Sequence, residues 1–215
     1  MQVIVVVGAA SVVDVLSPLG GVPMVVRSVR AFAGADVCVL VAGDPAPVRA
    51  ACAVLGVPVH GSVADAVGMV AQRSMCTEGD GPFTRHVLVH DAARPLVPPA
   101  LVRTVLDAAG LGHPAVVPVL PLADTVKTVD DGGLLLATPD RAALRVVQTP
   151  QAFTPDLLPL VLPAAMDDPA RGWAAAGAPV HTVAGDPRAF AVHTAWDREL
   201  AEATILAEAT IGARP

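Results

Sequence analysis

The sequence predicts an α/β protein with a mainly parallel sheet, and two patterns support that prediction. Short runs of Val, Leu and Ile alternate along the 215-residue chain with longer stretches of helical periodicity. The strand-like runs are almost continuously apolar, as expected of strands that helices cover on both faces. Alternation of this kind is typical of a doubly wound sheet. A chain of this length can bury a full core in one domain, so we expect a single domain over residues 1–215.

The elements follow in order along the chain. Strands are expected at Val3–Val7, Val37–Val41, Val87–Val89 and Val116–Val119. Helices are expected at Met24–Phe32, Pro45–Leu55, Ala64–Gln72, Pro99–Ala109 and Trp196–Ile211. Two of these helices begin at or near a proline, which is well suited to the first helical turn.

The segment Asp124–Arg145 departs from this alternation. Two β-prone runs, Thr125–Val129 and Leu134–Leu136, flank an Asp-Asp-Gly-Gly sequence at 130–133. An Asp-Gly or Gly-Gly step between such runs favours a β-hairpin. An isolated two-stranded arm is only marginally stable in water, and the three leucines would be exposed on it. We therefore expect a protruding hairpin that joins two copies of the chain in a homodimer.

Composition excludes several classes of function. The formal net charge is −6, and no basic block indicates binding to nucleic acid or to an anionic membrane. No apolar run is long enough to span a bilayer, and Met1–Val7 lacks the basic flank of a signal peptide. Cys38, Cys52 and Cys76 are odd in number and lack metal-ligand spacing. We expect buried, reduced thiols and a cytoplasmic protein.

Several motifs occur in a fixed order around these elements. His90-Asp91-Ala92-Ala93-Arg94-Pro95 follows a strand, and Asp124–Lys127, Asp140-Arg141 and Gln148–Phe153 come after it. In order and spacing the chain resembles the 2-C-methyl-D-erythritol 4-phosphate cytidylyltransferase family of the non-mevalonate isoprenoid pathway, most closely over Val87–Phe153. The resemblance implies a Rossmann-like nucleotidyltransferase fold with a β-hairpin dimerisation arm at about 124–145. It also implies a reaction in which CTP and methylerythritol 4-phosphate give a CDP-linked product and pyrophosphate, with Mg²⁺.

The resemblance assigns two catalytic residues to the end of a central strand. Asp91 would be the Mg²⁺ ligand, and Arg94 would orient the sugar phosphate, while His90 would be structural. Ligands of open α/β sheets do sit beyond the carboxyl ends of strands, and Mg²⁺ is held by one or two carboxylates together with phosphates. The alternative is that Asp91 caps the following turn and that Arg94 pairs with it.

Three further residues are assigned to the methylerythritol phosphate. Thr125 and Arg141 would reach from the arm into the site of the neighbouring subunit, where a guanidinium suits bidentate phosphate contact. Thr149 would face the substrate. The alternatives are a surface arginine on an exposed arm and a threonine hydroxyl that satisfies a turn.

The nucleotide side departs from the family pattern. The family's first loop has two glycines, an arginine and a lysine around the triphosphate; here Gly8, Ala9 and Ala10 lead into an apolar loop whose only charge is Asp14. No Lys or Arg occurs between residues 1 and 26. A second loop, at Gly61 and Ser62, lacks the family's arginine, and Ala191 stands where the family has a lysine.

These losses predict weak CTP binding. Four missing charge-assisted contacts would cost on the order of 5–10 kcal/mol, or about three to seven decades in rate. Two hypotheses follow. The chain is a divergent, impaired nucleotidyltransferase, or it is a catalytically silent paralogue that acts as a binding or dimer partner. In the second case a heterodimer with an intact paralogue could use Thr125 and Arg141 to complete the partner's site.

Overall fold

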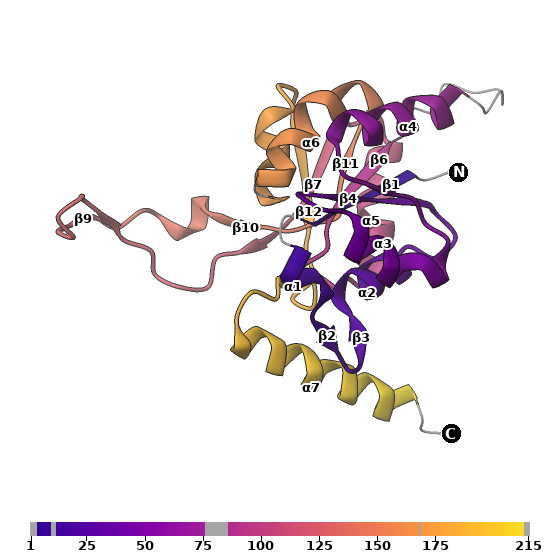
Figure 1. Ribbon diagram of the computed structural model, residues 1–215. Coiled ribbons are helices and arrows are strands. Elements are labelled where there is room, and N and C mark those ends of the chain that lie inside the picture. Colours follow the sequence, from indigo (N-terminus) through magenta and orange to yellow (C-terminus); the bar gives the residue numbers. More distant parts are fainter. Residues whose placement is uncertain (1–3, 10–11, 76–85, 168, 213–215) are drawn as a thin grey trace.

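The computed structural model describes residues 4–9, 12–75, 86–167 and 169–212. Its centre is an eight-stranded sheet in the order β10-β7-β11-β6-β1-β4-β5, with β12 also paired to β7 (Figure 1). The strands that run parallel are β1 (Ile4–Ala9), β4 (Asp36–Val41), β5 (Val59–His60), β6 (Val87–Asp91), β7 (Ala115–Pro121) and β12 (Val180–Ala184). Two short strands, β10 (Arg145–Val147) and β11 (Gln151–Phe153), run antiparallel to their neighbours.

The continuous apolar character of the strands follows from burial on both faces. Val7 and Val39 on neighbouring strands enter one core cluster, whereas Val6 and Cys38 enter the other. Successive side chains of a strand point to opposite faces, so every position must be apolar when both faces are covered. The mainly parallel sheet predicted from the sequence is therefore confirmed.

Helices cover the two faces of this sheet (Figure 1). One core cluster includes residues of α2 (Met24–Arg30), α3 (Ala46–Cys52) and α5 (Pro99–Gly110), and the other includes residues of α4 (Val63–Met75) and α6 (Leu158–Asp167). A single-turn helix, η1 (Ala53–Leu55), continues α3. These positions agree with the expected helices to within a few residues, except for α6, which the sequence reading missed.

Two of the three cysteines lie within the described residues. Cys38 on β4 and Cys52 on α3 are buried and not in disulfides. Burial raises the pKa of the Cys38 thiol to about 12 and also raises the pKa of Cys52. Both therefore remain protonated at neutral pH. Cys76, like Val3 and Ala10, lies outside the described residues.

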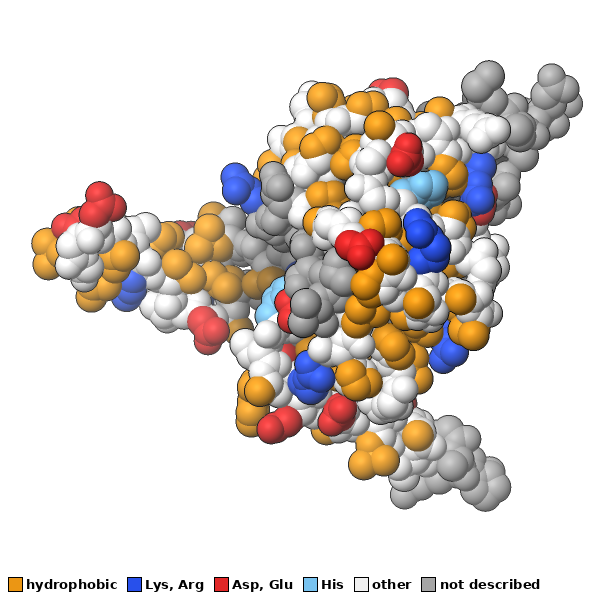
Figure 2. All heavy atoms as spheres, viewed as in Figure 1, with side chains coloured by type: hydrophobic (Ala, Val, Ile, Leu, Met, Phe, Trp, Pro, Cys, Tyr) orange, Lys and Arg blue, Asp and Glu red, His pale blue; other side chains and the backbone are white. Residues whose placement is uncertain are grey.

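The arm leaves the sheet after β7 and returns at β10 (Figure 1). Near its tip β8 (Thr128–Val129) pairs antiparallel with β9 (Leu135–Ala137). The Asp130 carboxylate closes the turn by accepting hydrogen bonds from the backbone N–H groups of Gly132 and Leu134. Gly133, which lies between these two residues, has a φ of +83°. The arm's larger apolar side chains are 55–67% exposed, namely Val129, Leu134, Leu135 and Leu136. Figure 2 shows hydrophobic side chains along this projection.

The C-terminal helix forms a small third core. α7 (Ala195–Gly212) packs through Ala201 and Ile205 against Leu19 of the short hairpin β2 (Pro18–Leu19) and β3 (Val22–Pro23). Figure 1 shows α7 beneath this hairpin. None of the helices in the described ranges combines the length and the apolar character that crossing a membrane would require.

Candidate functional site

The site begins where β6 ends, at the carboxyl edge of the sheet. Asp91 is the last residue of β6, and it lies beside Gly8 of β1 in the strand register. The next residue, Ala92, donates its N–H to the Gly8 carbonyl at 2.8 Å. This is the edge at which open α/β sheets bind their ligands.

Asp91 is held by a set of short contacts on its own chain. One carboxylate oxygen, Oδ1, accepts a hydrogen bond from the N–H of Ala93 at 2.9 Å. The other, Oδ2, is 3.7 Å from Nε of Arg94. The Asp91 N–H donates to Oγ1 of Thr149 at 3.1 Å. With only 6% of its surface exposed, the aspartate is fixed in one orientation at the strand end.

A buried histidine continues this network. Thr149 Oγ1 is 3.0 Å from Nδ1 of His90, and Nε2 of His90 is 3.2 Å from the Arg94 carbonyl. Burial, reinforced by the charge of Arg94, lowers the pKa of His90 to about 3. A neutral ring satisfies both contacts when Nε2–H donates to Arg94 and Nδ1 accepts from the threonine hydroxyl. Phe32 meets the ring edge-on, with centroids 4.9 Å apart. His90 is therefore a structural partner of the site.

Arg94 connects three segments of the chain. Its Nη1 donates to the Ala189 carbonyl at 2.7 Å, and its Nη2 donates to the Val147 carbonyl at 3.4 Å. With the ion pair to Asp91, the guanidinium thus bridges the ends of β6 and β10 and the segment after β12. Both alternatives raised from the sequence are visible, because Asp91 caps a turn and Arg94 pairs with it. Thr149, which is fully buried, likewise uses its hydroxyl within the chain.

Gln148 was quoted in a motif but given no role from the sequence. Its side chain, only 2% exposed, donates to the carbonyls of Asp186 and Ala189 and accepts from the Asp186 N–H. Gly185 permits this contact, because a Cβ there would lie 2.2 Å from Oε1 of Gln148. Gln148 and Arg94 together fasten the 185–192 segment, which carries Ala191, to the strand ends.

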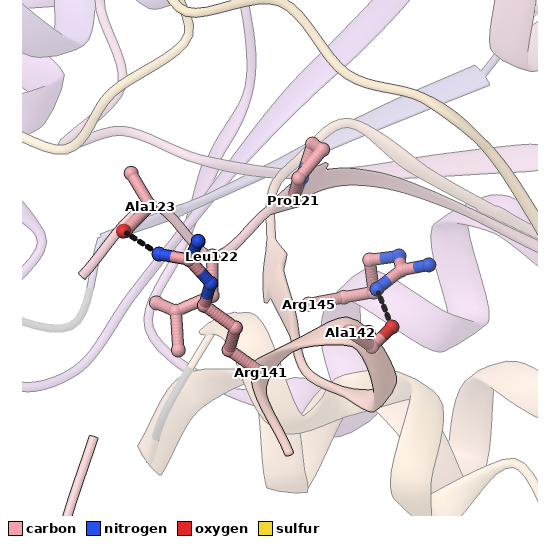
Figure 3. A pocket seen from close by; sticks show the side chains of 6 residues that line it. All are labelled: Pro121, Leu122, Ala123, Arg141, Ala142 and Arg145. Carbon is pink, nitrogen blue, oxygen red and sulfur yellow. Dashed lines mark hydrogen bonds between the residues drawn. The ribbon is translucent and has the colours of Figure 1, made fainter. Parts of the chain in front are cut away.

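The arm carries Thr125 and Arg141, and both are exposed. Arg141 begins a single-turn helix, η2 (Arg141–Ala143), and its Nη1 donates to the Ala123 carbonyl at 3.1 Å. Figure 3 shows Arg141 and Arg145 on either side of a hollow of about 570 Å³ at the base of the arm. Arg145 was not singled out from the sequence. The arm projects away from the sheet and from the rest of the chain (Figure 1).

A short helix follows β1, where the family resemblance places the first nucleotide loop. α1 (Val12–Leu16) occupies the position of the expected loop; Val15 is 2% exposed within the core, and Asp14 is exposed. Ala9 is fully buried. Arg27, the first cationic side chain in the sequence, donates from Nε to the Leu19 carbonyl at 2.8 Å.

The second loop that the resemblance assigns to the nucleotide, at Gly61 and Ser62, also makes contacts within the fold. Ser62 Oγ accepts the N–H of Asp65 at 3.1 Å, which makes Ser62 the N-cap of α4. Gly61 lies against the ring of Pro45, where a Cβ would be 3.3 Å from Cγ. Ser62 followed by Asp65 before an apolar run is an N-cap pattern in the sequence, but the resemblance assigns the same residue to nucleotide binding.

The contacts described at the strand ends include one carboxylate, that of Asp91. Among the described residues, no group of three or more His, Cys, Asp or Glu side chains lies close enough together to hold a metal ion. A single aspartate suits Mg²⁺ only when phosphate oxygens and water complete the octahedron. Asp91 is the residue that would hold the ion in that mode, although its two carboxylate oxygens already contact the Ala93 N–H and Arg94 of this chain.

Comparison with known proteins agrees with this geometry. The family model for 2-C-methyl-D-erythritol 4-phosphate cytidylyltransferase matches residues 10–207. The chain is 45% identical over 193 residues to the cytidylyltransferase of that name from Nocardia farcinica, covering 86% of this chain and 82% of the relative. The 2-C-methyl-D-erythritol 4-phosphate cytidylyltransferase from Thermus thermophilus, known from a crystal structure, is 30% identical to this chain in sequence. The two structures superpose with a TM-score of 0.70, covering 96% of this chain and all of that one. A 4-diphosphocytidyl-2C-methyl-D-erythritol synthase structure, 23% identical over 95% of this chain and 98% of that one, shares the fold with a TM-score of 0.75. The chain therefore belongs to the 2-C-methyl-D-erythritol 4-phosphate cytidylyltransferase family.

Proposed function

We propose that this chain retains the sugar-phosphate side of the family's site but transfers a cytidylyl group from CTP much more slowly than its relatives. The reaction would be attack of the methylerythritol 4-phosphate oxygen on the α-phosphorus of CTP, with pyrophosphate leaving. Chemistry of this kind depends on positioning and on neutralising the phosphate charge. When bound, Mg²⁺ would supply part of that neutralisation from Asp91.

The observation that carries the proposal is the burial of Val15. In the place of a cationic phosphate loop the chain has α1, which is anchored in the core by this side chain and bears the acidic Asp14. Residues 1–26 contain no Lys or Arg, and the Nε of Arg27 is committed to the Leu19 carbonyl. Repacking the core would be needed to convert α1 into a phosphate loop.

The residues at the strand ends support retention of a phosphate-facing edge. Arg94 is fixed by two carbonyls and by Asp91, so its guanidinium is preorganised. Preorganised donors contribute to charge stabilisation without reorganisation cost. The partner subunit's arm would add Thr125 and Arg141. We therefore assign Asp91 and Arg94 to the reacting phosphates. Thr149 would position Asp91, because its hydroxyl oxygen accepts the hydrogen bond from the Asp91 N–H.

A direct test compares this chain with the Nocardia farcinica relative. Both purified proteins are titrated with CTP and Mg²⁺ by calorimetry, and pyrophosphate release is measured with methylerythritol 4-phosphate. We expect turnover lower by about three to seven decades, as four lost charge-assisted contacts imply. Low-micromolar CTP binding with turnover close to that of the relative would refute the proposal.

A second candidate function follows from the exposed arm. Its leucines are uncovered in a single chain, and Arg141 is held there by the Ala123 carbonyl alone among the hydrogen bonds described. We propose a homodimer through the arm, and also a heterodimer in which this chain's Thr125 and Arg141 complete the site of an intact paralogue. The mixed dimer would carry one working site and one silent site.

Co-expression with an intact paralogue, using different affinity tags, separates these assemblies. In a purified mixed dimer, Arg141→Ala in this chain should lower turnover at least about tenfold, because a charge-assisted phosphate contact is lost. Asp14→Ala in the same chain is the matched control and should leave turnover unchanged. Recovery of homodimers alone, or equal turnover for both variants, would eliminate the heterodimer.

A further inference from the structure

A second hollow, of about 320 Å³, lies between α2, the segment 95–99 and α7. Three arginines from two separate parts of the chain line it: Arg27 and Arg30 on α2, and Arg188 after β12. The remaining lining is largely apolar. We propose that this hollow binds the phosphate group of a small organic phosphomonoester, at a site separate from Asp91 and independent of the proposed cytidylyl transfer.

Arg27 is oriented before any ligand arrives. Its Nε–H is bonded to the Leu19 carbonyl, which uses one of the five donors of the guanidinium. The adjacent Gly20 leaves room for the group, because a Cβ at this position would lie 2.9 Å from Nη2. Gly20 also has a φ of +52°, which favours glycine. A guanidinium held in this way loses less entropy when it binds an anion.

Arg188 supplies a second oriented guanidinium. It forms a two-point contact with Asp186, at 3.1 Å from Nε and 2.9 Å from Nη2. Its remaining nitrogen, Nη1, is 3.7 Å from Glu208 on α7, which is too far for a good hydrogen bond. The Glu208 side chain is 59% exposed. A phosphate oxygen could take the place of this loosely paired carboxylate and form a shorter contact.

Two further features favour an anion over a cation in the hollow. Arg30 is exposed, and its guanidinium forms no hydrogen bond or ion pair with any other residue that the structure describes. The N-terminus of the twelve-residue helix α5 opens here at Pro98 and Pro99, with no acidic residue in its first turn. The dipole of this helix adds partial positive charge at that end, although Pro98 and Pro99 have no N–H to donate. On a chain of net charge −6, this is a local concentration of positive potential.

The shape of the lining indicates an organic phosphate. Leu96, Val97 and Ile205 form an apolar wall beside the arginines. An inorganic phosphate would leave this wall in water, whereas the carbon portion of an ester would cover it. We therefore expect phenyl phosphate to bind more tightly than inorganic phosphate.

The experiment maps and weakens the binding of phenyl phosphate to the full chain. Amide shifts of the ¹⁵N-labelled protein should change at residues 27–31, 96–97 and 205–208. Arg30→Gln and Arg188→Gln should each raise Kd about tenfold, the equivalent of one charge-assisted hydrogen bond. Glu208→Gln should lower Kd, because it removes the competing carboxylate. Arg103→Gln, on the exposed side of α5 and outside the lining, is the charge-matched control and should leave Kd unchanged.

Three results would overturn the proposal. Shift changes centred on Asp91 or on the Arg141 hollow would place the phosphate in the other sites. An equal effect of Arg30→Gln and Arg103→Gln would reduce the interaction to the net charge of the protein. A chain that binds no phenyl phosphate at millimolar concentrations would leave Arg27 and Arg30 serving only the C-terminus of α2, where positive charge is favourable in any case.

Discussion

Replacing His90 should remove a pH dependence of stability that its burial creates. The folded pKa is about 3, against 6.5 for the unperturbed group, so between these values the unfolded chain binds a proton that the folded chain does not. Stability from this group is therefore present above pH 6.5 and is lost as pH falls toward 3. Between pH 7 and pH 5 the loss amounts to about 2 kcal/mol, at 1.36 kcal/mol per pH unit over roughly 1.5 units.

The assay is urea unfolding at pH 7 and pH 5 of the wild-type chain and of His90→Asn. Asparagine retains an acceptor for the Thr149 hydroxyl, although the contact to the Arg94 carbonyl is lost. The variant will be less stable at both pH values, so the quantity compared is the difference between them. That difference should be smaller by about 2 kcal/mol in the variant.

Val105→Ala provides the matched control for general destabilisation. Val105 is fully buried in α5 and carries no titrating group, so this variant should lose stability while keeping the wild-type difference between pH 7 and pH 5. If His90→Asn also keeps that difference, His90 is not held neutral by burial and the network around Asp91 has been misread. An NMR titration of the His90 ring with a midpoint near 6.5 would lead to the same conclusion.

Three further outcomes are expected. Gly185→Ala should destabilise the chain by about 1–3 kcal/mol in chemical denaturation, because the added Cβ would overlap the Gln148 side chain. Gly68→Ala, in the middle of α4 with open space around it, should instead stabilise the chain by roughly 0.5–1 kcal/mol. Equal effects of the two substitutions would contradict the packing argument. Ala191→Lys should tighten CTP binding in calorimetry by about tenfold through one added charge-assisted contact, and an unchanged affinity would show that this position does not face the nucleotide. Leu135→Asp should convert the proposed homodimer to monomer in sedimentation without lowering the stability of the monomer, because Leu135 is 65% exposed in the single chain. An unaltered dimer would place the interface elsewhere, and a wild-type chain that sediments as a monomer would refute the arm-mediated dimer itself.

The parallel core of the fold was predictable because strands that are buried on both faces appear in the sequence as runs of consecutive apolar residues. β1, β4 and β6 are built around the apolar runs Val3–Val7, Val37–Val41 and Val87–Val89, and runs of this kind have few alternatives in a sequence without a membrane-length apolar segment. The short antiparallel strands β10 and β11 were not predictable. Each pairs over only two or three residues, so their formation depends on β6 and β7 being in place already.

Helix α6 was missed for a different reason. Its sequence carries Pro159 near the start and Pro163 inside, and both signal a break when read locally. The tertiary context outweighs that signal, because Leu158, Val161 and Leu162 are at most 1% exposed against the sheet. Local propensity is a weak guide wherever burial of this extent is available.

The site was predictable in position but only partly in chemistry. The strand-end rule and the motif order place Asp91, Arg94 and Thr149 together, and the structure does bring them together. The turn cap at Asp91 and its pairing with Arg94 are alternatives that the sequence offers. The contact of Arg94 with the Ala189 carbonyl and that of Gln148 with Asp186 could not be foreseen, since these partners lie 95 and 38 residues apart. Ser62 shows the same limit, because an N-cap and a ligand contact require the same residue type.

The two halves of the site differ in what their residues do for folding, and this difference decides which of them report on function. Asp91, Arg94 and Thr149 are buried or nearly so and join separate segments, so their removal would leave buried partners unsatisfied at a cost of about 1–3 kcal/mol each. Contacts within the fold are therefore sufficient to account for these three residues, whether or not Asp91 and Arg94 also act on the phosphates as proposed. Arg141 is exposed and makes one described hydrogen bond, so its removal should cost the fold little. A substitution at Arg141 therefore tests phosphate binding without disturbing the fold, whereas a substitution at Asp91 would change both.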